Sequence, residues 1–339
     1  MQEYDKILTV SVAAYNAEKT LREVLDSFVG MRHMDNIEVI VIDDGGTDAS
    51  LEIAKSYADR FPDVFIPVHK ENGGWGSTVN YSIRNARGKY FKLLDGDDYY
   101  KTGHLDSFVE YLFSADADLI VTPYCTFRDG EELEPQIAEN YDSSYIEGHI
   151  YALDKTEKPF PLAMHALAVK RDLLLSHDIR LKEHCVYRDM EFTANIILYA
   201  DSICFFSKPI YYYRLGRDGQ SISIPQYLKH MDEHADIVYD ILSKTLDIRN
   251  GRKIQLLYEL AEGAYVQQFK IYYYAKPDRE TYRKLKEFNR HIKDKYPVFY
   301  EKAKLPMPYY LFQKMDFSFY YGVAAAADVR RKILRSLKN

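Results

Sequence analysis

The sequence predicts an α/β fold in which helices cover both faces of a mostly parallel central sheet, followed by a helical C-terminal extension. Between residues 7 and 122, strand-like apolar segments alternate with amphipathic helical segments, as in doubly wound sheets. One of these strands is apolar almost throughout, which is typical of a strand buried on both faces. From about residue 226 the pattern is helical to the end. We therefore expect two domains, residues 1–225 and 226–339.

The strands are predicted where short runs rich in Val, Ile, Leu and aromatic residues occur between turn-forming residues. They are expected at 7–12, 37–42, 64–68, 90–94, 118–122, 203–206 and 210–213. The intervening 129–160 is polar and rich in Asp and Glu, so we expect mainly loop there. In a parallel sheet, ligands bind beyond the carboxyl ends of the strands.

The helices are predicted from apolar residues at helical spacing and from capping residues. The first helix places Leu21, Val24, Leu25, Phe28 and Val29 on one face. Asp48 is expected to cap the second helix, and Ser77 a third that runs through Arg87 and stops at Gly88. Another helix is expected to begin near Asp189. The helices of the C-terminal domain are expected to break at Pro277, Pro297, Pro306 and Pro308.

Composition excludes several classes of protein. A formal net charge of -6 argues against a general nucleic-acid binder. Three widely spaced cysteines make a disulfide framework or a structural zinc site a poor expectation. No apolar run is long enough to cross a membrane, and the N-terminus lacks the features of a signal peptide. These observations favour a cytoplasmic protein.

Charge is distributed unevenly along the chain. Residues 270–339 hold 17 Lys and Arg and 7 Asp and Glu, a balance of +10, which leaves -16 for residues 1–269. The segment 329–338 has five basic residues and no acid, and Ile333, Leu334 and Leu337 can share one helical face. Such a helix can lie peripherally on the anionic inner face of a cell membrane. A solvated terminal helix and an oligomerisation helix are the alternatives.

Acidic residues gather after two of the predicted strands. Asp95-Gly96-Asp97-Asp98 follows the strand at 90–94, and its carboxylates repel one another unless a divalent cation such as Mg²⁺ or Mn²⁺ lies between them. A solvated acidic turn is the alternative. Asp43 and Asp44 close the strand at 37–42 in the same way. Since Asp48 is available as the helix cap, at least one of these two acids is free for another role.

A glycine-rich loop, Asn72-Gly73-Gly74-Trp75-Gly76-Ser77, lies between a strand and a helix. Glycines permit a close approach of the backbone, and a helix N-terminus attracts phosphate. The loop nearly spells a dinucleotide-binding fingerprint, but the last glycine is missing and it does not follow the first strand. The sequence therefore favours a phosphate-containing ligand other than a nicotinamide cofactor.

Taken in order, these motifs resemble family 2 glycosyltransferases, which have the GT-A fold. The resemblance rests on Val10-Ser11-Val12-Ala13-Ala14-Tyr15-Asn16, Asp43-Asp44-Gly45, the glycine loop, Asp95-Gly96-Asp97-Asp98 and Asp189, and covers roughly residues 5–225. The segment from Tyr212 to Arg217, with Gly219-Gln220-Ser221, is similar to the end of the catalytic domain in bacterial members that build surface polysaccharides.

The resemblance implies a role for individual residues. Tyr15 would stack on or flank the base of the donor nucleotide, Asp44 would bind its uracil, and Asp95 would hold its ribose. Asp97 would be the metal ligand that bridges to the diphosphate, and Asp189 the catalytic base. The remaining donor-binding positions are Ala13, Asp43, Asn72, Gly74 and Gly96. Positions with an accessory or acceptor role are Asp98, His165, Arg188 and Arg214.

The sequence departs from the family pattern in three places. Ala13-Ala14 and Val79 differ from the residues usual in the donor-binding loops. Arg188 replaces the glutamate that commonly precedes the base. We expect Arg188 either to lower the pKa of Asp189 or to pair with phosphate.

The resemblance implies an inverting, metal-dependent transfer of a sugar from a nucleoside-diphosphate sugar, with UDP favoured, to a glycan or lipid-linked acceptor. The Gln-x-x-Arg-Trp motif and membrane helices of processive synthases are absent, so one sugar or a few should be added. A nucleotide-sugar pyrophosphorylase is an alternative, although its glycine-rich start is missing. The second alternative is a non-catalytic scaffold with a degenerate transferase fold.

Overall fold

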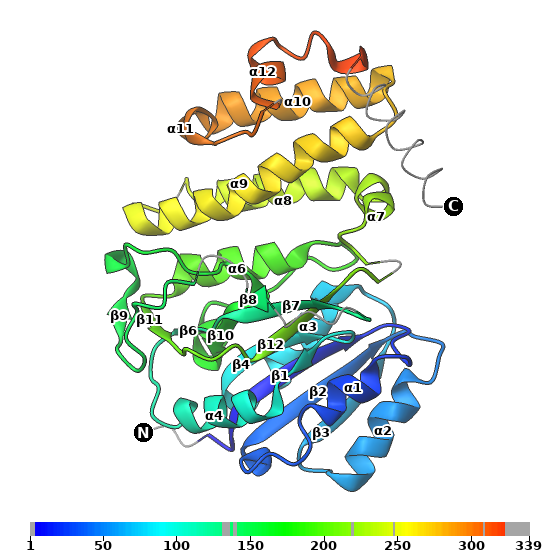
Figure 1. Ribbon diagram of the computed structural model, residues 1–339, viewed down its shortest axis with the longest axis vertical. Coiled ribbons are helices and arrows are strands. Elements are labelled where there is room, and N and C mark those ends of the chain that lie inside the picture. The colour runs from blue at the N-terminus through cyan, green and yellow to red at the C-terminus, as the bar shows by residue number, and fades with distance from the viewer. Residues whose placement is uncertain are drawn as a thin grey trace. The chain divides into compact units, whose positions relative to one another are not determined.

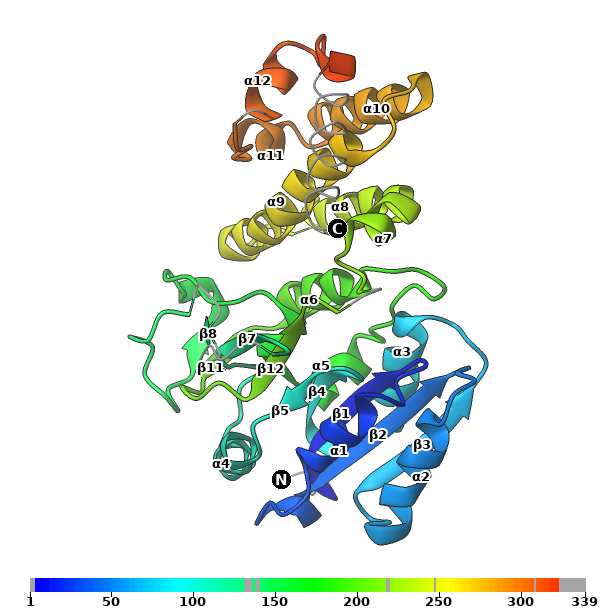
Figure 2. The same cartoon turned by 45° about the vertical axis from the view of Figure 1, so that its right-hand side comes forward.

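The computed structural model describes residues 4–130, 136–137, 141–217, 220–246, 248–307 and 309–322. It divides into two compact units, Met1–Arg217 and Asp218–Asn339. Figures 1 and 2 show the first unit, from blue to green, as sheet and helices and the second, from yellow-green to red, as helices alone. The two units divide after Arg217, a few residues before the boundary that the sequence predicts near residue 225.

The first unit is built on an eight-stranded sheet that is mostly parallel, as the sequence predicts. Its order is β3 (Phe65–Lys70), β2 (Ile37–Asp44), β1 (Lys6–Ala14), β4 (Gly88–Asp95), β10 (Leu167–Lys170), β6 (Leu119–Val121), β11 (Ser202–Phe205) and β9 (Tyr151–Ala152). The first four strands in this order are mutually parallel. Strand β10 runs antiparallel to β4 and β6. The carboxyl ends of four strands therefore meet at one edge.

A second, smaller sheet joins four short strands, and the sequence pattern predicted only part of it. Its order is β5 (Tyr99–Tyr100), β12 (Tyr211–Leu215), β7 (Tyr124–Arg128) and β8 (Gln136–Ile137). Strands β8 and β9 fall in the region 129–160, where only loop was expected. Each has two residues, too few to give a recognisable alternation.

Helices cover both faces of the large sheet, as expected. They are α1 (Leu21–Asp26), α2 (Ser50–Arg60), α3 (Trp75–Asn85), α4 (Thr102–Leu112), α5 (Arg171–Ser176) and α6 (Arg188–Tyr199), with short 3₁₀ turns at Met34–Asn36, Leu153–Lys155 and Met164–Ala166. Successive β1 residues point to opposite faces. Val10 belongs to the core that contains Leu21 of α1, whereas the hydroxyl of Ser11 donates to Ser82 of α3 at 2.7 Å.

Two predicted helix caps are wrong. Helix α3 begins at Trp75 with Gly74 as its cap residue, so Ser77 lies inside the first turn and its hydroxyl donates to the Gly74 carbonyl at 2.7 Å. Gly74 has a φ of 79°, which glycine adopts without strain, and this lets the helix start earlier. Asp48 likewise precedes the cap position of α2, although its carboxylate accepts the amide of Ser50 at 3.0 Å.

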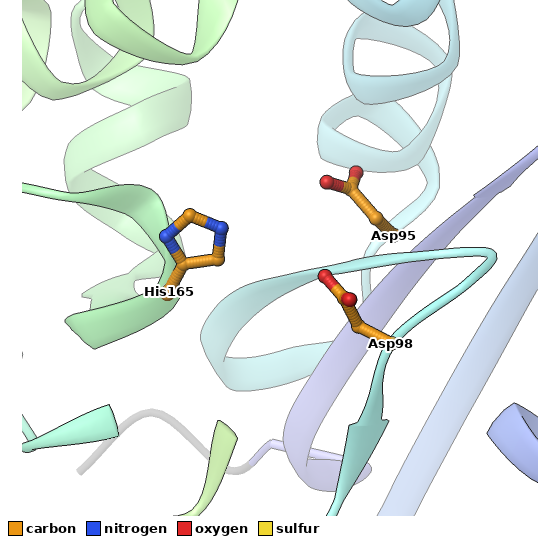
Figure 3. Close-up of side chains that lie close together, drawn as sticks. All are labelled: Asp95, Asp98 and His165. Atoms are coloured by element: carbon orange, nitrogen blue, oxygen red, sulfur yellow. The ribbon is translucent and has the colours of Figure 1, made fainter. Parts of the chain in front are cut away.

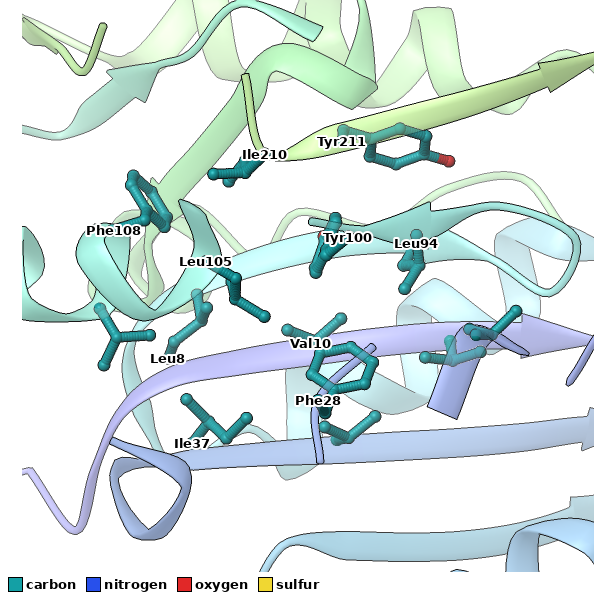
Figure 4. Close-up of a cluster of buried hydrophobic side chains, with 14 of the residues drawn as sticks. Leu8, Val10, Phe28, Ile37, Leu94, Tyr100, Leu105, Phe108, Ile210 and Tyr211 are labelled. Atoms are coloured by element: carbon teal, nitrogen blue, oxygen red, sulfur yellow. The ribbon is translucent and has the colours of Figure 1, made fainter. Parts of the chain in front are cut away.

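One hydrophobic core cluster of the first unit lies between the large sheet and helices α1, α2 and α4. Figure 4 shows Val10, Phe28, Tyr100 and Tyr211 among its side chains, and each of them is at most 1% exposed. The hydroxyls of the two tyrosines have polar partners, the Leu93 carbonyl and Asp98. Burial of an apolar side chain of this size contributes about 1.5–3 kcal/mol. This packing fixes β1 and β4, whose ends carry most of the residues discussed below.

The second unit is helical in its described residues. Its helices are α7 (Ile224–Lys229), α8 (Met231–Ser243), α9 (Gly251–Tyr274), α10 (Arg279–Lys295), α11 (Pro297–Lys302) and α12 (Tyr309–Lys314). Pro277 lies between α9 and α10, and Pro297 is the first residue of α11, so both mark helix breaks as expected. Tyr265, Phe269 and Phe288 pack together in its core.

The basic segment 329–338 and Pro308 lie outside the described residues. Within the described part of the chain, no helix is both long and apolar enough to cross a membrane.

Candidate active site

The predicted donor-binding residues come from neighbouring parallel strands. The register places Ala13 of β1 opposite Asp95 of β4, and Ala14 opposite Asp43 of β2. Asp44 stands opposite Lys70 at the end of β3. The strands end together, so their polar residues form one edge, as expected for a ligand site of an α/β sheet.

Asp44 anchors the glycine loop. Its Oδ1 accepts Lys70 Nζ at 2.7 Å and the Gly73 amide at 3.0 Å, and its Oδ2 accepts the Gly74 amide at 2.8 Å. Asn72 adds a bond from its side-chain amide to the Asp44 carbonyl at 2.8 Å. Asp44 is 4% exposed. The sequence predicts this acid as a base-binding residue, and the structure adds that it shapes the loop beside the site.

Asp43 is the penultimate residue of β2, and Tyr15 directly follows β1. Asp43 Oδ1 accepts the Gly46 amide at 3.0 Å, and its Oδ2 lies 2.7 Å from His69 Nδ1. Asn16 joins the loops after these two strands, because its Oδ1 accepts the Thr47 amide at 2.9 Å. Tyr15, the residue before Asn16, is 60% exposed. An exposed aromatic ring directly after a strand of this edge is suited to bind a nucleotide base.

Asp95 lies at the centre of the acidic group. Its Oδ1 accepts the indole N–H of Trp75, the first residue of α3, at 2.9 Å. Burial, together with the charges of Asp97 and Asp189, raises the pKa of Asp95 to about 7, although the bond from Trp75 acts in the opposite direction. The charge of Asp189, in the first turn of α6, acts on Asp95 at the end of β4, although 94 residues separate the two in sequence.

The turn after β4 is held tightly against β1. The Gly96 amide donates to the Ala13 carbonyl at 3.0 Å, and a Cβ at Gly96 would lie 2.7 Å from that oxygen. Only glycine fits this approach without a shift of the backbone. Asp97 follows and forms an ion pair with Arg217 at 3.0 Å.

Asp98 is buried beneath the second sheet. The Tyr211 hydroxyl donates to its Oδ2 and the Arg214 amide to its Oδ1, the latter at 2.8 Å. Burial, together with Asp95 and Asp97, holds the pKa of Asp98 well above its usual range. The guanidinium of Arg214 donates to the Asp97 carbonyl at 2.8 Å and pairs with Glu23 and Asp129. Asp98 and Arg214 therefore tie the acidic turn to β12.

His165 completes a cluster with two of these acids. Figure 3 shows its ring facing the carboxylates of Asp95 and Asp98, and the potential ligand atoms of the three residues lie within 4.8 Å of one another. Burial, with a smaller contribution from Lys92, lowers the pKa of His165 to about 3, so the imidazole is neutral. Its Nδ1 is buried and has no hydrogen-bond partner among the described residues.

The donor atoms of this cluster fit a divalent cation. Carboxylate oxygens and a neutral imidazole suit Mn²⁺, and a carboxylate that accepts two hydrogen bonds still has free lone pairs. The mutual repulsion that helps to raise the pKa values of Asp95 and Asp98 is the kind a cation relieves. Asp97, the ligand predicted from sequence, lies outside the cluster of Asp95, Asp98 and His165, but close enough to raise the pKa of Asp95.

Asp189 lies in the first turn of α6, next to Arg188. Burial raises the pKa of Asp189, while backbone amides at the helix start lower it. Arg188 is 1% exposed, and its Nη1 lies 3.4 Å from Glu191 Oε2. Of the two roles expected for Arg188, a lowered pKa of Asp189 does not agree with this direction, because burial outweighs the hydrogen bonds from the backbone amides. A raised pKa favours proton uptake by the carboxylate, as a general base requires.

Several residues of the site were not predicted. Lys92 is 1% exposed and donates to the carbonyls of His165 at 2.7 Å and Leu167 at 3.2 Å. Trp75 donates a hydrogen bond to Asp95, and Tyr211 donates one to Asp98. A lysine inside the apolar run Tyr90-Phe91-Lys92-Leu93-Leu94 is a signal that could have been noticed, because a lysine is rarely fully buried without partners.

Comparison with known proteins identifies relatives of the chain. Residues 9–174 match the model of Glycosyl transferase family 2. The putative glycosyltransferase EpsH of Bacillus subtilis (strain 168) is 28% identical over 250 residues, which cover 72% of this chain and 70% of EpsH. The minor teichoic acid biosynthesis protein GgaB of the same strain is 27% identical over 219 residues, 63% of this chain but only 23% of GgaB.

Solved structures show the same fold. The crystal structure of S. aureus TarS 1-349 in complex with UDP has a TM-score of 0.66 at 20% identity, covering 95% of this chain and 91% of that one. The same protein in complex with UDP-GlcNAc gives 0.64 at 21% identity, with the same coverage. The predicted GT-A fold is thereby confirmed.

Proposed function

Because this chain belongs to glycosyltransferase family 2, we propose that it transfers a sugar, with inversion, from a UDP-sugar to a glycan or lipid-linked acceptor in the synthesis of a cell-surface polysaccharide. Three findings support the proposal. TarS binds UDP and UDP-GlcNAc on a similar fold. GgaB is named for teichoic acid biosynthesis. The charge of Asp189 acts on Asp95 at the end of β4, and this interaction carries the mechanism.

The donor is proposed to lie along the edge formed by the ends of β1, β2 and β4. Tyr15, directly after β1, is exposed and can cover the face of the base, and Asp43 and Asp44 end the neighbouring strand β2. Asp95, held by Trp75, is positioned for the ribose. The amides of Gly73 and Gly74 already bind Asp44, so the loop presents a fixed backbone rather than one that must order on binding.

Asp189 is proposed to remove the proton from the acceptor hydroxyl as that oxygen attacks the anomeric carbon. The bond to the diphosphate breaks on the opposite face, which gives inversion. A divalent cation, Mn²⁺ or Mg²⁺, would offset the charge of the departing diphosphate when bound. The residues that would hold it are Asp97, predicted from sequence, and the cluster of Asp95, Asp98 and His165.

The test is an Asp189→Asn variant. We expect transfer to fall by about 10² or more while nucleotide affinity stays within twofold of wild type, on the usual scale of general-base loss. In the wild type, transfer should decline as the pH falls through the raised pKa of Asp189, because the protonated acid cannot accept a proton. Steady-state rates and calorimetric affinities across pH measure both effects.

Glu191→Gln is the matched control, since Glu191 is also an acid of the first helical turn but pairs with Arg188. Wild-type transfer by Asp189→Asn would place the base elsewhere. If neither the wild type nor any variant transfers sugar, although nucleotide still binds, the scaffold alternative would be favoured. The family match already favours a transferase over a pyrophosphorylase.

A further inference from the structure

The second unit carries an apolar surface that its core does not use. Met307, Leu311, Met315 and Phe319 are 65, 44, 46 and 56% exposed, and Tyr310 and Tyr321 beside them are 44 and 45% exposed. We call the first four residues, which lie in α12 and on either side of it, the exposed face of α12. Asp316 and Phe317 have φ values of 50° and 61°, so Phe319 follows a break in the helix. Leu311 and Met315 are four residues apart, the spacing of one side of a helix. The backbone bond from Met315 to Leu311 at 2.9 Å extends this helical geometry beyond α12 (Figure 1).

The opposite side of the same segment is firmly packed. Phe312 contacts Tyr273 with ring centroids 5.2 Å apart, and Phe317 and Tyr320 are at most 1% exposed. The Gln313 side-chain amide donates to the Tyr265 hydroxyl at 2.7 Å and to Asn289 Oδ1 at 2.9 Å. The segment is therefore fixed on α9 and α10. Its exposed apolar residues are presented by a packed element rather than by a loose end.

The charge around the exposed face of α12 is basic. Residues 279–322 hold ten Lys or Arg and five Asp or Glu. Lys302, Lys304 and Lys314 are exposed near the face in sequence, and Lys314 Nζ lies 5.4 Å from the centre of the Tyr310 ring. Asp316, the acid within the segment, pairs with Lys286. The chain continues directly into residues 323–339, which add five basic residues and one acid.

From this combination we infer that the exposed face of α12 docks on an anionic lipid surface. Apolar and aromatic side chains enter the boundary between headgroups and acyl chains, and neighbouring lysines bind the anionic headgroups. A second copy of this chain is a poorer match, since the two basic surfaces would repel each other. The inference does not depend on which sugar is transferred.

The test measures sedimentation of the full chain with vesicles. The probes are vesicles of equal parts phosphatidylcholine and phosphatidylglycerol, and vesicles of phosphatidylcholine alone. We expect binding to the anionic vesicles that weakens with added salt. Replacing Leu311→Ser and Met315→Ser together should weaken the partition coefficient about 100-fold, near tenfold for each apolar side chain lost.

Leu246→Ser is the control, because Leu246 belongs to the same unit, is 55% exposed and lies outside the exposed face of α12. It should bind vesicles like wild type. Circular dichroism melting confirms that each variant is folded. If the double variant does not fold, Phe319→Ser alone replaces it, with an expected loss of about tenfold. Transfer to a water-soluble acceptor should be unchanged, which separates this inference from the proposed function.

Three results would overturn the inference. Equal vesicle binding by wild type and the folded double variant would exclude this face as the docking surface. Loss of binding only when Arg330, Arg331 and Lys332 are replaced by Gln would assign binding to the C-terminal tail alone. No vesicle binding, together with a dimer in sedimentation velocity that the double variant abolishes, would assign the face to a second copy of the chain.

Discussion

At the scale of single residues, Lys92 decides where His165 lies. It is a buried cation whose partners are two backbone carbonyls, and burial lowers its pKa to about 7. A buried group of this kind is maintained only if its hydrogen bonds offset the cost of removing it from water. These bonds fix the turn Met164–Ala166. They therefore also fix the position of His165 relative to the carboxylates of Asp95 and Asp98.

Replacement of Lys92 by Met should therefore affect both stability and activity. Two buried carbonyls lose their partner, so we expect the free energy of unfolding to fall by about 1–3 kcal/mol. Transfer should fall as well, because the turn that carries His165 is no longer fixed. Urea unfolding and steady-state rates measure the two effects.

The control is Lys89→Met on the same strand. Lys89 donates to the Ala115 carbonyl, away from the acidic cluster, so it should lose some stability but keep its rate. Equal rates for wild type and Lys92→Met would show that the position of His165 does not matter for transfer.

The candidate site could be predicted from sequence where adjacent residues share chemistry. The three carboxylates within Asp95-Gly96-Asp97-Asp98 can be recognised in the sequence, because their mutual repulsion is unfavourable unless a cation offsets it. The partners that fix them could not be predicted. Tyr211 reaches Asp98 from a strand more than a hundred residues away, and its hydroxyl is indistinguishable in sequence from those of the other tyrosines.

At the scale of elements, the acidic turn depends on how closely β4 and β1 approach. Gly96 touches the Ala13 carbonyl, so any side chain there must push the turn away from β1. We expect Gly96→Ala to weaken nucleotide affinity about tenfold or more, since a shift of the turn moves Asp95 and Asp97 together. Calorimetric titration of UDP with Mn²⁺ measures this.

Gly103→Ala is the matched control at this scale. Gly103 lies in the first turn of α4, and a Cβ at this position would point into open space. Alanine in a helix is favoured over glycine by about 0.5–1 kcal/mol, so stability should rise slightly while affinity is unchanged. If both glycine variants bound UDP like wild type, close approach of the turn to β1 would not be required.

Most elements were predictable because their apolar periodicity reflects burial. Strands β1, β2 and β4 lie within a residue or two of the predicted ranges, since nearly all of their residues are buried. The errors have local causes. Ser77 resembles a cap in sequence, but the positive φ of Gly74 starts α3 earlier. Strand β9 owes its pairing to a partner distant in sequence, Ile203 of β11, and β8 has only two residues to pair with β7.

At the scale of the whole molecule, the proposed active-site residues lie in the first unit, whereas the excess of positive charge lies toward the C-terminus. The first unit carries the acidic strand ends and Asp189, and the chain up to residue 269 has a balance of -16. The remainder has a balance of +10 and includes the exposed face of α12. We propose that one unit binds and transfers sugar while the other brings it to an anionic surface where a lipid-linked acceptor would be found.

The central claim is that the edge formed by β1, β2 and β4 is a metal-assisted site for a uridine nucleotide. The most direct test is calorimetric titration of the full chain with UDP, GDP and dTDP, each with Mn²⁺ and with EDTA. We predict that UDP binds at least about tenfold more tightly than GDP or dTDP, and that EDTA removes most of its affinity. Binding of none of the three, or UDP affinity equal with Mn²⁺ and with EDTA, would contradict the claim.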